Sequence, residues 1–244
     1  MNAGKLLCFL LFLVSGFQID AQICLNDVEL DRISQVKIRE YLKSEQEQGV
    51  LTFEEIKPSM QTNSDIKGYM VRENIYQVKK GIDEVWSNYI NRSPNKSWNG
   101  KKVSFGFLFS KKENRIVYSD ENLQKIDTGM VVYLNLRLVS GLVNVATAFE
   151  IINIDKNNKI IEFSYLSGNE SEGKQRLQFI QTRKGYTQIL HTSFYKSGTF
   201  LRNYLFYPYF HTRITHEFHR NFKKQIWVHS EKSFDPLSPK GGTS

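Results

Sequence analysis

The sequence has little cysteine, proline or glycine. Among its 244 residues there are 2 Cys, 5 Pro and 15 Gly. Two cysteines exclude a disulfide-stapled scaffold and a zinc site built from cysteines. So little proline and glycine also excludes a collagen-like or low-complexity chain. With 40% hydrophobic and 24% charged residues, the composition is that of a globular protein, long enough for a large core or an internal cavity.

Long hydrophobic runs are absent as well. The longest, Leu6–Val14, is too short to span a bilayer, which takes about 20 apolar residues. It follows Lys5 and precedes a small residue at Ala21, so residues 1–21 are expected to be a cleaved export signal. We therefore expect an exported protein, periplasmic or secreted. The alternative is a protein anchored in the membrane by an uncleaved signal.

Positive charge predominates, with 33 Lys and Arg against 25 Asp and Glu and a formal net charge of +8. Part of it comes as separate pairs rather than as one basic stripe: Lys79-Lys80, Lys101-Lys102, Lys111-Lys112 and Lys223-Lys224. Dispersed lysines keep sheet edges soluble and argue against a nucleic-acid partner. In an exported protein they favour a weak attraction to anionic membrane surfaces or acidic glycans.

The region after the signal predicts a helical appendage. Apolar residues over 26–48 follow a loose helical spacing, which Gly49 ends. Residues 50–67 show no clean period and contain Pro58, which indicates a connector. We therefore place an appendage at 22–67 and a main domain at 68–229.

The main domain begins with a strand at 69–78 and a helix at 82–90. No proline occurs between Pro94 and Pro208. Alternating runs in that stretch predict strands at 103–110, 115–119, 130–139, 142–154, 160–167, 174–182 and 186–196. Strands so closely spaced must pair antiparallel, since a parallel crossover takes about a dozen residues or more. In the first of these strands, alternation places on one face Val103, Phe105, Phe107 and Phe109.

Residues 199–229 predict one long C-terminal helix. Its apolar stripe recurs every four residues, at Phe210, Ile214, Phe218 and Phe222, with Tyr207 and His211 on the same side. His216 and His219 are expected on the solvated side. Residues 230–244 contain Pro236 and Pro239 and predict a disordered tail.

Strand, short helix, antiparallel meander and long helix follow the order of an α+β helix-grip domain, in which a curved sheet wraps around the C-terminal helix. The segment Val78–Trp86 resembles the first strand and helix, with its buried tryptophan, of the START-type or polyketide-cyclase-like superfamily (SRPBCC). Within that superfamily, Ile161–Phe179 and His191–Tyr195 resemble one bacterial domain family of unknown function, although its loop histidine and paired glutamates are missing here. The resemblance covers about residues 69–228. It implies a cavity between sheet and helix that binds a hydrophobic or amphipathic, lipid-like small molecule.

The residues expected to line this cavity come from the short helix, two strands and the last helix: Trp86, Tyr165, His191, Tyr195, Tyr207, His211, Ile214 and Phe218. If Tyr165 and His191 both point inward, they form a polar cluster with His211 in an aromatic cavity. A few convergent polar groups among aromatic side chains are the usual make-up of a small-molecule site. The alternative is a filled core with a few satisfied polar groups.

Two other classes of function stay open. One is an acid–base enzyme that uses His191, His211 and Glu162, since some members of the superfamily are cyclases or hydratases. The other is a packed domain without a cavity that acts through partners. The sequence contains no nucleophile elbow and no glycine-rich phosphate loop. His216 and His219 are three residues apart, whereas a zinc-protease helix needs a spacing of four, so we expect neither a metal nor another cofactor.

Overall fold

The computed structural model describes residues 22–121, 123, 125–168, 171–197 and 207–232. The predicted signal (1–21), the predicted helix start (199–206) and most of the predicted tail (233–244) lie outside these residues. In chain order the elements are η1 (Leu25–Asp27), η2 (Leu30–Arg32), α1 (Val36–Glu47), β1 (Met70–Val78), α2 (Ile82–Ile90), α3 (Pro94–Ser97), β2 (Val103–Ser110), β3 (Arg115–Tyr118), β4 (Met130–Leu138), η3 (Val139–Gly141), β5 (Val143–Asp155), β6 (Ile160–Tyr165), β7 (Ser171–Gln181), β8 (Thr187–Ser197) and α4 (Tyr207–Lys232).

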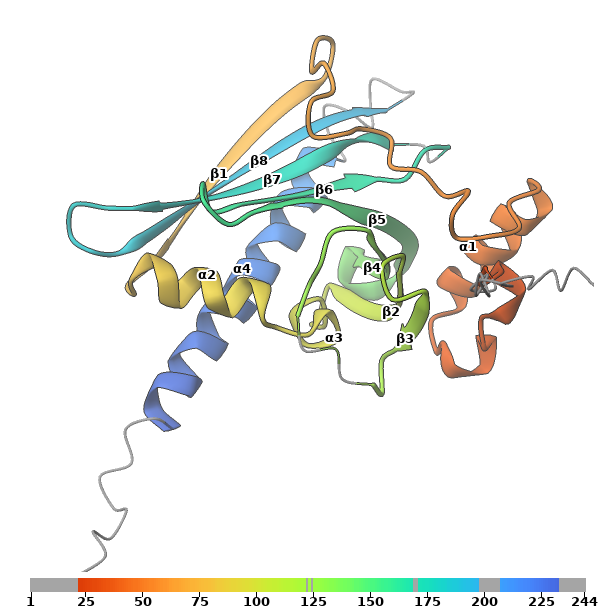
Figure 1. The fold of residues 1–244 in the computed structure, drawn as a ribbon, viewed down its shortest axis with the longest axis horizontal. Helices are drawn as coiled ribbons and strands as arrows, with labels where there is room; N and C mark the ends of the chain where they lie inside the picture. The colour runs from red at the N-terminus through yellow and green to blue at the C-terminus, as the bar shows by residue number, and fades with distance from the viewer. Residues whose placement is uncertain (1–21, 122, 124, 169–170, 198–206, 233–244) are drawn as a thin grey trace, which may run out of the picture.

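The strands form one 8-stranded sheet in the order β1-β8-β7-β6-β5-β4-β2-β3, with antiparallel neighbours throughout. The sheet is curved, and α4 crosses one of its faces with α2 and α3 beside it (Figure 1). We call this the inner face and the opposite one the outer face. A curved antiparallel sheet around a long C-terminal helix is the helix-grip arrangement, so the predicted fold class is confirmed.

The inner core fills the space between sheet and helices. Its strand residues alternate with residues of the outer face, as period-2 geometry requires. They include Phe149, Phe163 and Leu177 from the sheet, which pack with Trp86 of α2 and Phe218 of α4.

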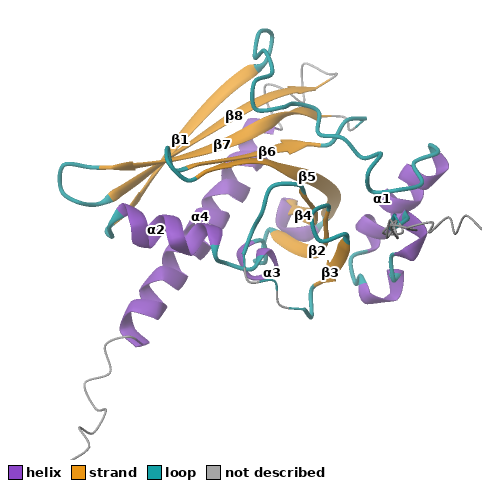
Figure 2. Cartoon of the chain, viewed as in Figure 1, coloured by secondary structure: helices purple, strands orange, loops and turns teal. Residues whose placement is uncertain are grey.

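The predicted appendage, residues 22–67, is a second packing layer on the outer face (Figure 2). Phe53 is fully buried there, stacked on Phe109 at 4.3 Å between ring centroids and edge-on to Phe107 and Tyr133. The connector then follows the outer side of the sheet, where the Ser59 backbone N–H donates to the Tyr165 carbonyl at 2.7 Å. The sheet is therefore covered on both faces, which explains why its middle strands are buried on both sides.

Three elements differ from the sequence prediction. The helix predicted over 26–48 begins only at Val36, after two short 3-10 turns. The four-residue α3 was not predicted, because one turn is too short to show a period. The described part of the last helix is Tyr207–Lys232, and the start predicted at 199 lies outside the described residues. That helix also continues to Lys232, past the predicted boundary at 229.

The prediction that β2 keeps its apolar side chains on one face was wrong. The register of β2 against β4 shifts between Phe105 and Phe107, so Phe105 packs in the inner core and Phe107 on the outer face. Gly106 occupies the shift, and a Cβ there would lie 2.4 Å from Cδ1 of Ile38 in α1. A bulge exchanges the faces of a strand, and glycine admits the close approach of the helix.

Among the described residues, no helix combines the length and the apolar character needed to cross a membrane.

Candidate functional site

Aromatic side chains fill most of the inner space. Trp98, which follows α3, stacks on Phe218 with 4.0 Å between ring centroids. The same indole lies 5.1 Å from the ring of Phe149 and 5.8 Å, edge-on, from that of Phe163. Trp98 is only half-buried, so it lies between the core and solvent.

A chain of mostly buried polar groups runs through this apolar core from α2 to β6. The Tyr89 hydroxyl lies 2.9 Å from Nδ1 of His219, whose Nε2 lies 2.8 Å from Nδ1 of His191. Nε2 of His191 then lies 3.0 Å from the side-chain oxygen of Gln175. The Gln175 amide donates to the Tyr165 hydroxyl at 3.3 Å. We call Tyr89, His219, His191, Gln175 and Tyr165 the polar chain.

The amide of Gln175, as oriented, sets the direction of every proton in this chain. Because its oxygen faces His191, Nε2 of His191 carries the proton and donates it. In a neutral imidazole Nδ1 then accepts, here from Nε2–H of His219. Nδ1 of His219 accepts in turn, from the Tyr89 hydroxyl. Every nitrogen of both imidazoles is therefore satisfied without a charge.

Burial keeps these histidines neutral. It lowers the pKa of His191 well below the usual value, and the neighbouring His219 and His211 lower it further. Burial also lowers the pKa of His219 to about 3, with a smaller contribution from His216. The pKa of His211 falls to about 3 for the same main reason, with a contribution from Arg72. A protonated imidazole in this core would lose its hydration. None of the contacts given above supplies a carboxylate that would stabilise the charge.

Tyr76 of β1 covers the polar chain on its solvent side. Its ring stacks on that of His219 at 3.9 Å between centroids. Its hydroxyl donates to Oγ1 of Thr215 at 3.2 Å and lies 3.3 Å from Nδ1 of His216. The β1 edge and α4 are thus joined directly over the chain.

A cavity of about 30 Å³ lies beside the polar chain. Its wall is mostly apolar, and its members include Tyr89, Ser97, Trp98, Phe149, Phe163 and Phe218. This volume is close to the share of one water molecule in the liquid, about 30 Å³. Sites for drug-sized molecules measure about 300 Å³ or more, so the space is nearly closed in this conformation.

The predicted site residues lie mainly on the inner side. Tyr165 and His191 are both linked to Gln175, and the ring of His211 lies 5.9 Å from that of His191, edge to face. The others also face the core or its border: Trp86 against Phe179, Phe218 against Trp98, Ile214 partly buried beside the core, and Tyr195 buried on β8. Tyr207 begins α4, but its side chain lies outside the described part of the structure.

Glu162 is not part of this site, which corrects the acid–base hypothesis that included it. It lies on the outer face of β6, because its neighbours Ile161 and Phe163 take the inner face. There it is buried and paired with Lys174 at 3.2 Å, and it accepts from Asn153 at 3.2 Å. The sheet separates this carboxylate from His191.

The expectation of a solvated His219 was also wrong, whereas His216 is exposed as expected. The buried stripe of α4 is wider than the Phe/Ile spacing suggested, because α2 covers a second side of the helix. His219 faces Tyr89 of α2 from that side. Gln175 was missed although alternation gave a signal, since it shares the face of Leu177 and Phe179.

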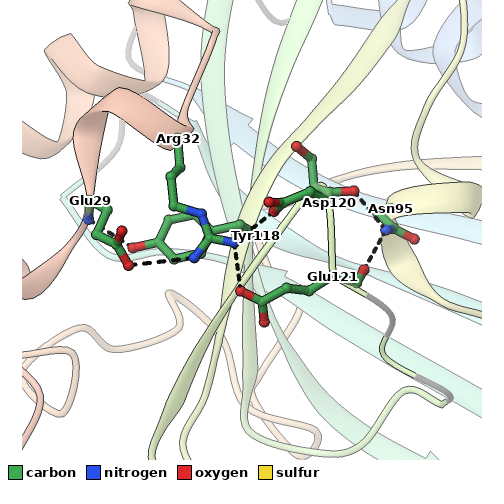
Figure 3. Close-up of polar contacts among 7 residues, drawn as sticks. Glu29, Arg32, Asn95, Tyr118, Asp120 and Glu121 are labelled. Atoms are coloured by element: carbon green, nitrogen blue, oxygen red, sulfur yellow. Dashed lines mark hydrogen bonds and ion pairs between the residues drawn. The ribbon is translucent and has the colours of Figure 1, made fainter.

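The border of the cavity is tied to the N-terminal segment by the network in Figure 3. The Arg32 guanidinium lies over the ring of Tyr118 and forms ion pairs of 2.8 Å with both Asp120 and Glu121. The carbonyl of Glu121 accepts from the side chain of Asn95 in α3 at 2.8 Å. Residues on the outer face thus hold the loop that positions α3.

Replacing Arg32 with Ala is therefore expected to loosen α3. Its amides, such as that of Trp98, which donates to the Pro94 carbonyl, should exchange hydrogen several-fold faster in mass-spectrometric exchange. Arg32→Lys should give an intermediate result, because lysine cannot form the two-sided fork. Arg115→Ala, which removes an exposed pair with Glu113, is the control and should leave α3 unchanged. Equal exchange in the Arg32→Ala variant and the native chain would contradict the coupling.

Within the described part of the chain, no three His, Cys, Asp or Glu side chains are grouped so as to hold a metal ion.

No protein-family model matches the sequence, and no curated protein sequence matches it either. Solved structures do match the fold. Norcoclaurine synthase from Thalictrum flavum, in complex with dopamine and hydroxybenzaldehyde, is 12% identical, with a TM-score of 0.48 over 70% of this chain and 96% of that one. Major latex-like protein 151 from Panax ginseng is 11% identical, with a TM-score of 0.47 over 65% and 97%. Protein NE0264 from Nitrosomonas europaea is 9% identical, with a TM-score of 0.45 over 68% and 97%.

Identities and TM-scores this low carry no argument about function, and the fold assignment rests on the strand order and on the position of α4. The closer resemblance to one bacterial domain family stays a prediction. The sheet order with β1 beside β8, and a long C-terminal helix across the inner face, identify the chain as having the helix-grip fold.

Proposed function

We propose that this protein binds a small amphipathic molecule between the inner face of the sheet and α4. The observation that carries the proposal is the polar chain, which ends at a side chain lining an otherwise apolar cavity. A satisfied buried polar network needs no ligand for its own stability. One that reaches a cavity wall supplies a fixed polar contact in an apolar site, which is how small-molecule sites orient their ligands.

The direction of the protons narrows the class of ligand. Tyr89 uses its own proton toward His219, so its oxygen is left to accept. Because burial raises the pKa of Tyr89 well above the usual value, the phenol stays protonated and neutral. A charged head group would find no opposite charge on Tyr89 or on the two neutral imidazoles. We therefore propose a ligand with an apolar body and an uncharged hydrogen-bond donor, such as a hydroxyl.

Entry of such a molecule requires the small cavity to widen. Trp98 is the side chain placed to do this, since it lines the cavity, is half-buried and follows the short helix α3. Its closest ring contact is the stack on Phe218, and among the described residues the indole forms no hydrogen bond or ion pair that would oppose its movement. We propose that the indole closes the site when it is empty and swings outward when a ligand enters.

The proposal is tested by titrating the protein with 1-aminoanthracene, an uncharged fluorescent dye with an apolar body and an amine donor, and then displacing the dye with a long-chain alcohol. Saturable fluorescence with one dye per chain, reversed by the alcohol, is the expected result. Fluorescence that rises without saturation, or that the alcohol does not reverse, would reject the proposal.

Trp98→Phe is expected to strengthen dye binding several-fold, because a smaller ring leaves more apolar space in the cavity. Trp86→Phe is the matched control. That indole packs on Phe179, with the Lys159 ammonium above its ring, and it does not line the cavity. Equal affinities of the two variants in the same titration would show that the dye does not occupy this cavity.

The acid–base alternative has weaker support. His191 and His219 use both ring nitrogens within the polar chain, so neither presents an open nitrogen to a ligand. The carboxylate assigned to that mechanism, Glu162, lies on the other side of the sheet.

A further inference from the structure

The turn between β4 and β5 exposes three aliphatic side chains together. Val139 is 51% exposed, Leu142 84% and Val143 47%. We call these three residues the apolar tip. Single exposed aliphatic residues are ordinary, but three within five positions form a patch. The tip lies outside both cores and has no role in the proposed ligand site.

The apolar tip is held in a defined shape. Val139 has φ of 47°, a conformation that β-branched residues rarely adopt, and Ser140 and Gly141 also have positive φ. The backbone N–H of Leu142 donates to the Val139 carbonyl at 3.1 Å. The side chain of Asn144 donates to the Gly141 carbonyl at 3.2 Å. A strained turn fixed by these bonds keeps the aliphatic side chains pointing outward.

Cationic side chains lie beside the tip. Arg137 is exposed, and its backbone N–H donates to the Lys102 carbonyl at 2.7 Å. The Arg137 guanidinium donates to the Gly100 carbonyl at 3.2 Å, next to the exposed Lys101. Strand β4 and the turn before β2 thus bring three positive charges to one edge: Lys101, Lys102 and Arg137.

Helix α4 extends this basic edge. Glu217 accepts from the Lys102 backbone N–H at 2.9 Å, which places that side of α4 against the turn. Arg213 and Arg220 lie at i−4 and i+3 from Glu217, on the same side of the helix, and both are exposed. Glu217, which lies among them, is buried. The elements beside the tip therefore carry five cationic side chains: Lys101, Lys102, Arg137, Arg213 and Arg220.

We propose that the apolar tip and its basic edge dock the protein on an anionic lipid bilayer. Aliphatic side chains enter the boundary between head groups and acyl chains, while lysine and arginine remain with the anionic head groups. Single-stranded nucleic acid is a poorer fit, because such sites stack bases on aromatic rings and the tip has none. The charge complementarity together with the aliphatic tip therefore favours the bilayer.

The test is cosedimentation of the full chain with vesicles of phosphatidylglycerol and phosphatidylcholine, and with vesicles of phosphatidylcholine alone. Binding only to the anionic vesicles, weaker at high salt, is expected. Leu142→Ser should reduce the affinity by about tenfold, because it removes most of a leucine's transfer into the bilayer. Arg137→Gln should reduce it by about fivefold, as expected for one cation near the surface.

The matched control is Ile75→Ser on the edge strand β1. Ile75 is 62% exposed, but the exposed Glu73 lies on the same face of that strand, so this variant should bind like the native chain. Because Leu142 and Ile75 are both exposed, neither substitution should unfold the protein, which a thermal melt checks. Absence of native binding to anionic vesicles would overturn the proposal. So would equal binding by the Leu142→Ser variant, or binding to an oligonucleotide in place of the vesicles.

Discussion

The free energy of unfolding is expected to fall steeply as the pH drops below 6.5. His211 and His219 keep folded-state pKa values of about 3 against an ordinary value of 6.5, and the pKa of His191 is lowered well below it too. Below pH 6.5 these histidines bind protons in the unfolded chain but not in the folded chain. The free energy of unfolding therefore decreases as the pH falls from 6.5 toward the folded-state pKa values. Each buried histidine contributes a slope approaching about 1.4 kcal/mol per pH unit.

Urea unfolding at several pH values between 6.5 and 4.5 measures this slope. That window lies above the ordinary pKa of Asp120 and Asp127, whose pKa values are lowered further by Arg32 and Lys112, so these carboxylates add little to the change. His219→Gln should lower the slope by up to about 1.4 kcal/mol per pH unit. Phe222→Leu, a core substitution in the same helix, should lower stability at every pH and keep the slope. A stability independent of pH in this window would contradict the buried, neutral chain.

Lys174→Met is expected to lower the free energy of unfolding by about 3–5 kcal/mol, because it leaves the buried Glu162 carboxylate without its cation. Lys174 also donates to the Thr62 carbonyl at 2.6 Å, so the same substitution detaches the connector from the outer face. The double variant Glu162→Gln with Lys174→Met should recover most of the loss, since no charge is then buried.

Chemical denaturation near neutral pH measures both effects. The control is Lys37→Met, which removes a pair with Glu40 whose side chains are 48% and 55% exposed. It should change the free energy by no more than about 0.5 kcal/mol. A loss of similar size for Lys37→Met and Lys174→Met would show that the outer-face pair is not buried as described. A full loss of ligand binding with folding unchanged in Glu162→Gln would revive a functional role for this carboxylate.

Most of the fold was predictable because two periods govern it. Alternating runs between Pro94 and Pro208 predicted the strands to within a few residues, and α2 coincides with the predicted helix at Ile82–Ile90. The alternation rule failed at Gly106, because one extra residue in a bulge moves the following side chains of the strand to the opposite face of the sheet. In the sequence, the only sign of this bulge is a glycine within an apolar run. The packing of residues 22–67 on the outer face was not predictable. The apolar character of the outer-face strand residues indicates that they are buried, but it does not indicate which segment of the chain covers them.

The candidate site was predictable only in part. Alternation showed which neighbours share a face with Tyr165 and with His191 on their strands. Only the structure showed that both faces point inward. His219 was assigned to solvent because a stripe defined by every fourth residue is narrower than a helix packed on two sides. Its hydrogen bond to Tyr89 joins elements 130 residues apart in the chain, and no local pattern reports such a contact.

The central claim is that the space between sheet and α4 holds one small molecule, and native mass spectrometry tests it most directly. Protein purified without detergent should carry a single non-covalent adduct per chain that disappears under denaturing conditions. Val132→Phe, which fills the cavity from β4, should lose that adduct while keeping the native far-ultraviolet circular dichroism spectrum. A bare mass for the native chain, even after incubation with a long-chain alcohol, or an adduct that Val132→Phe retains, would contradict the claim.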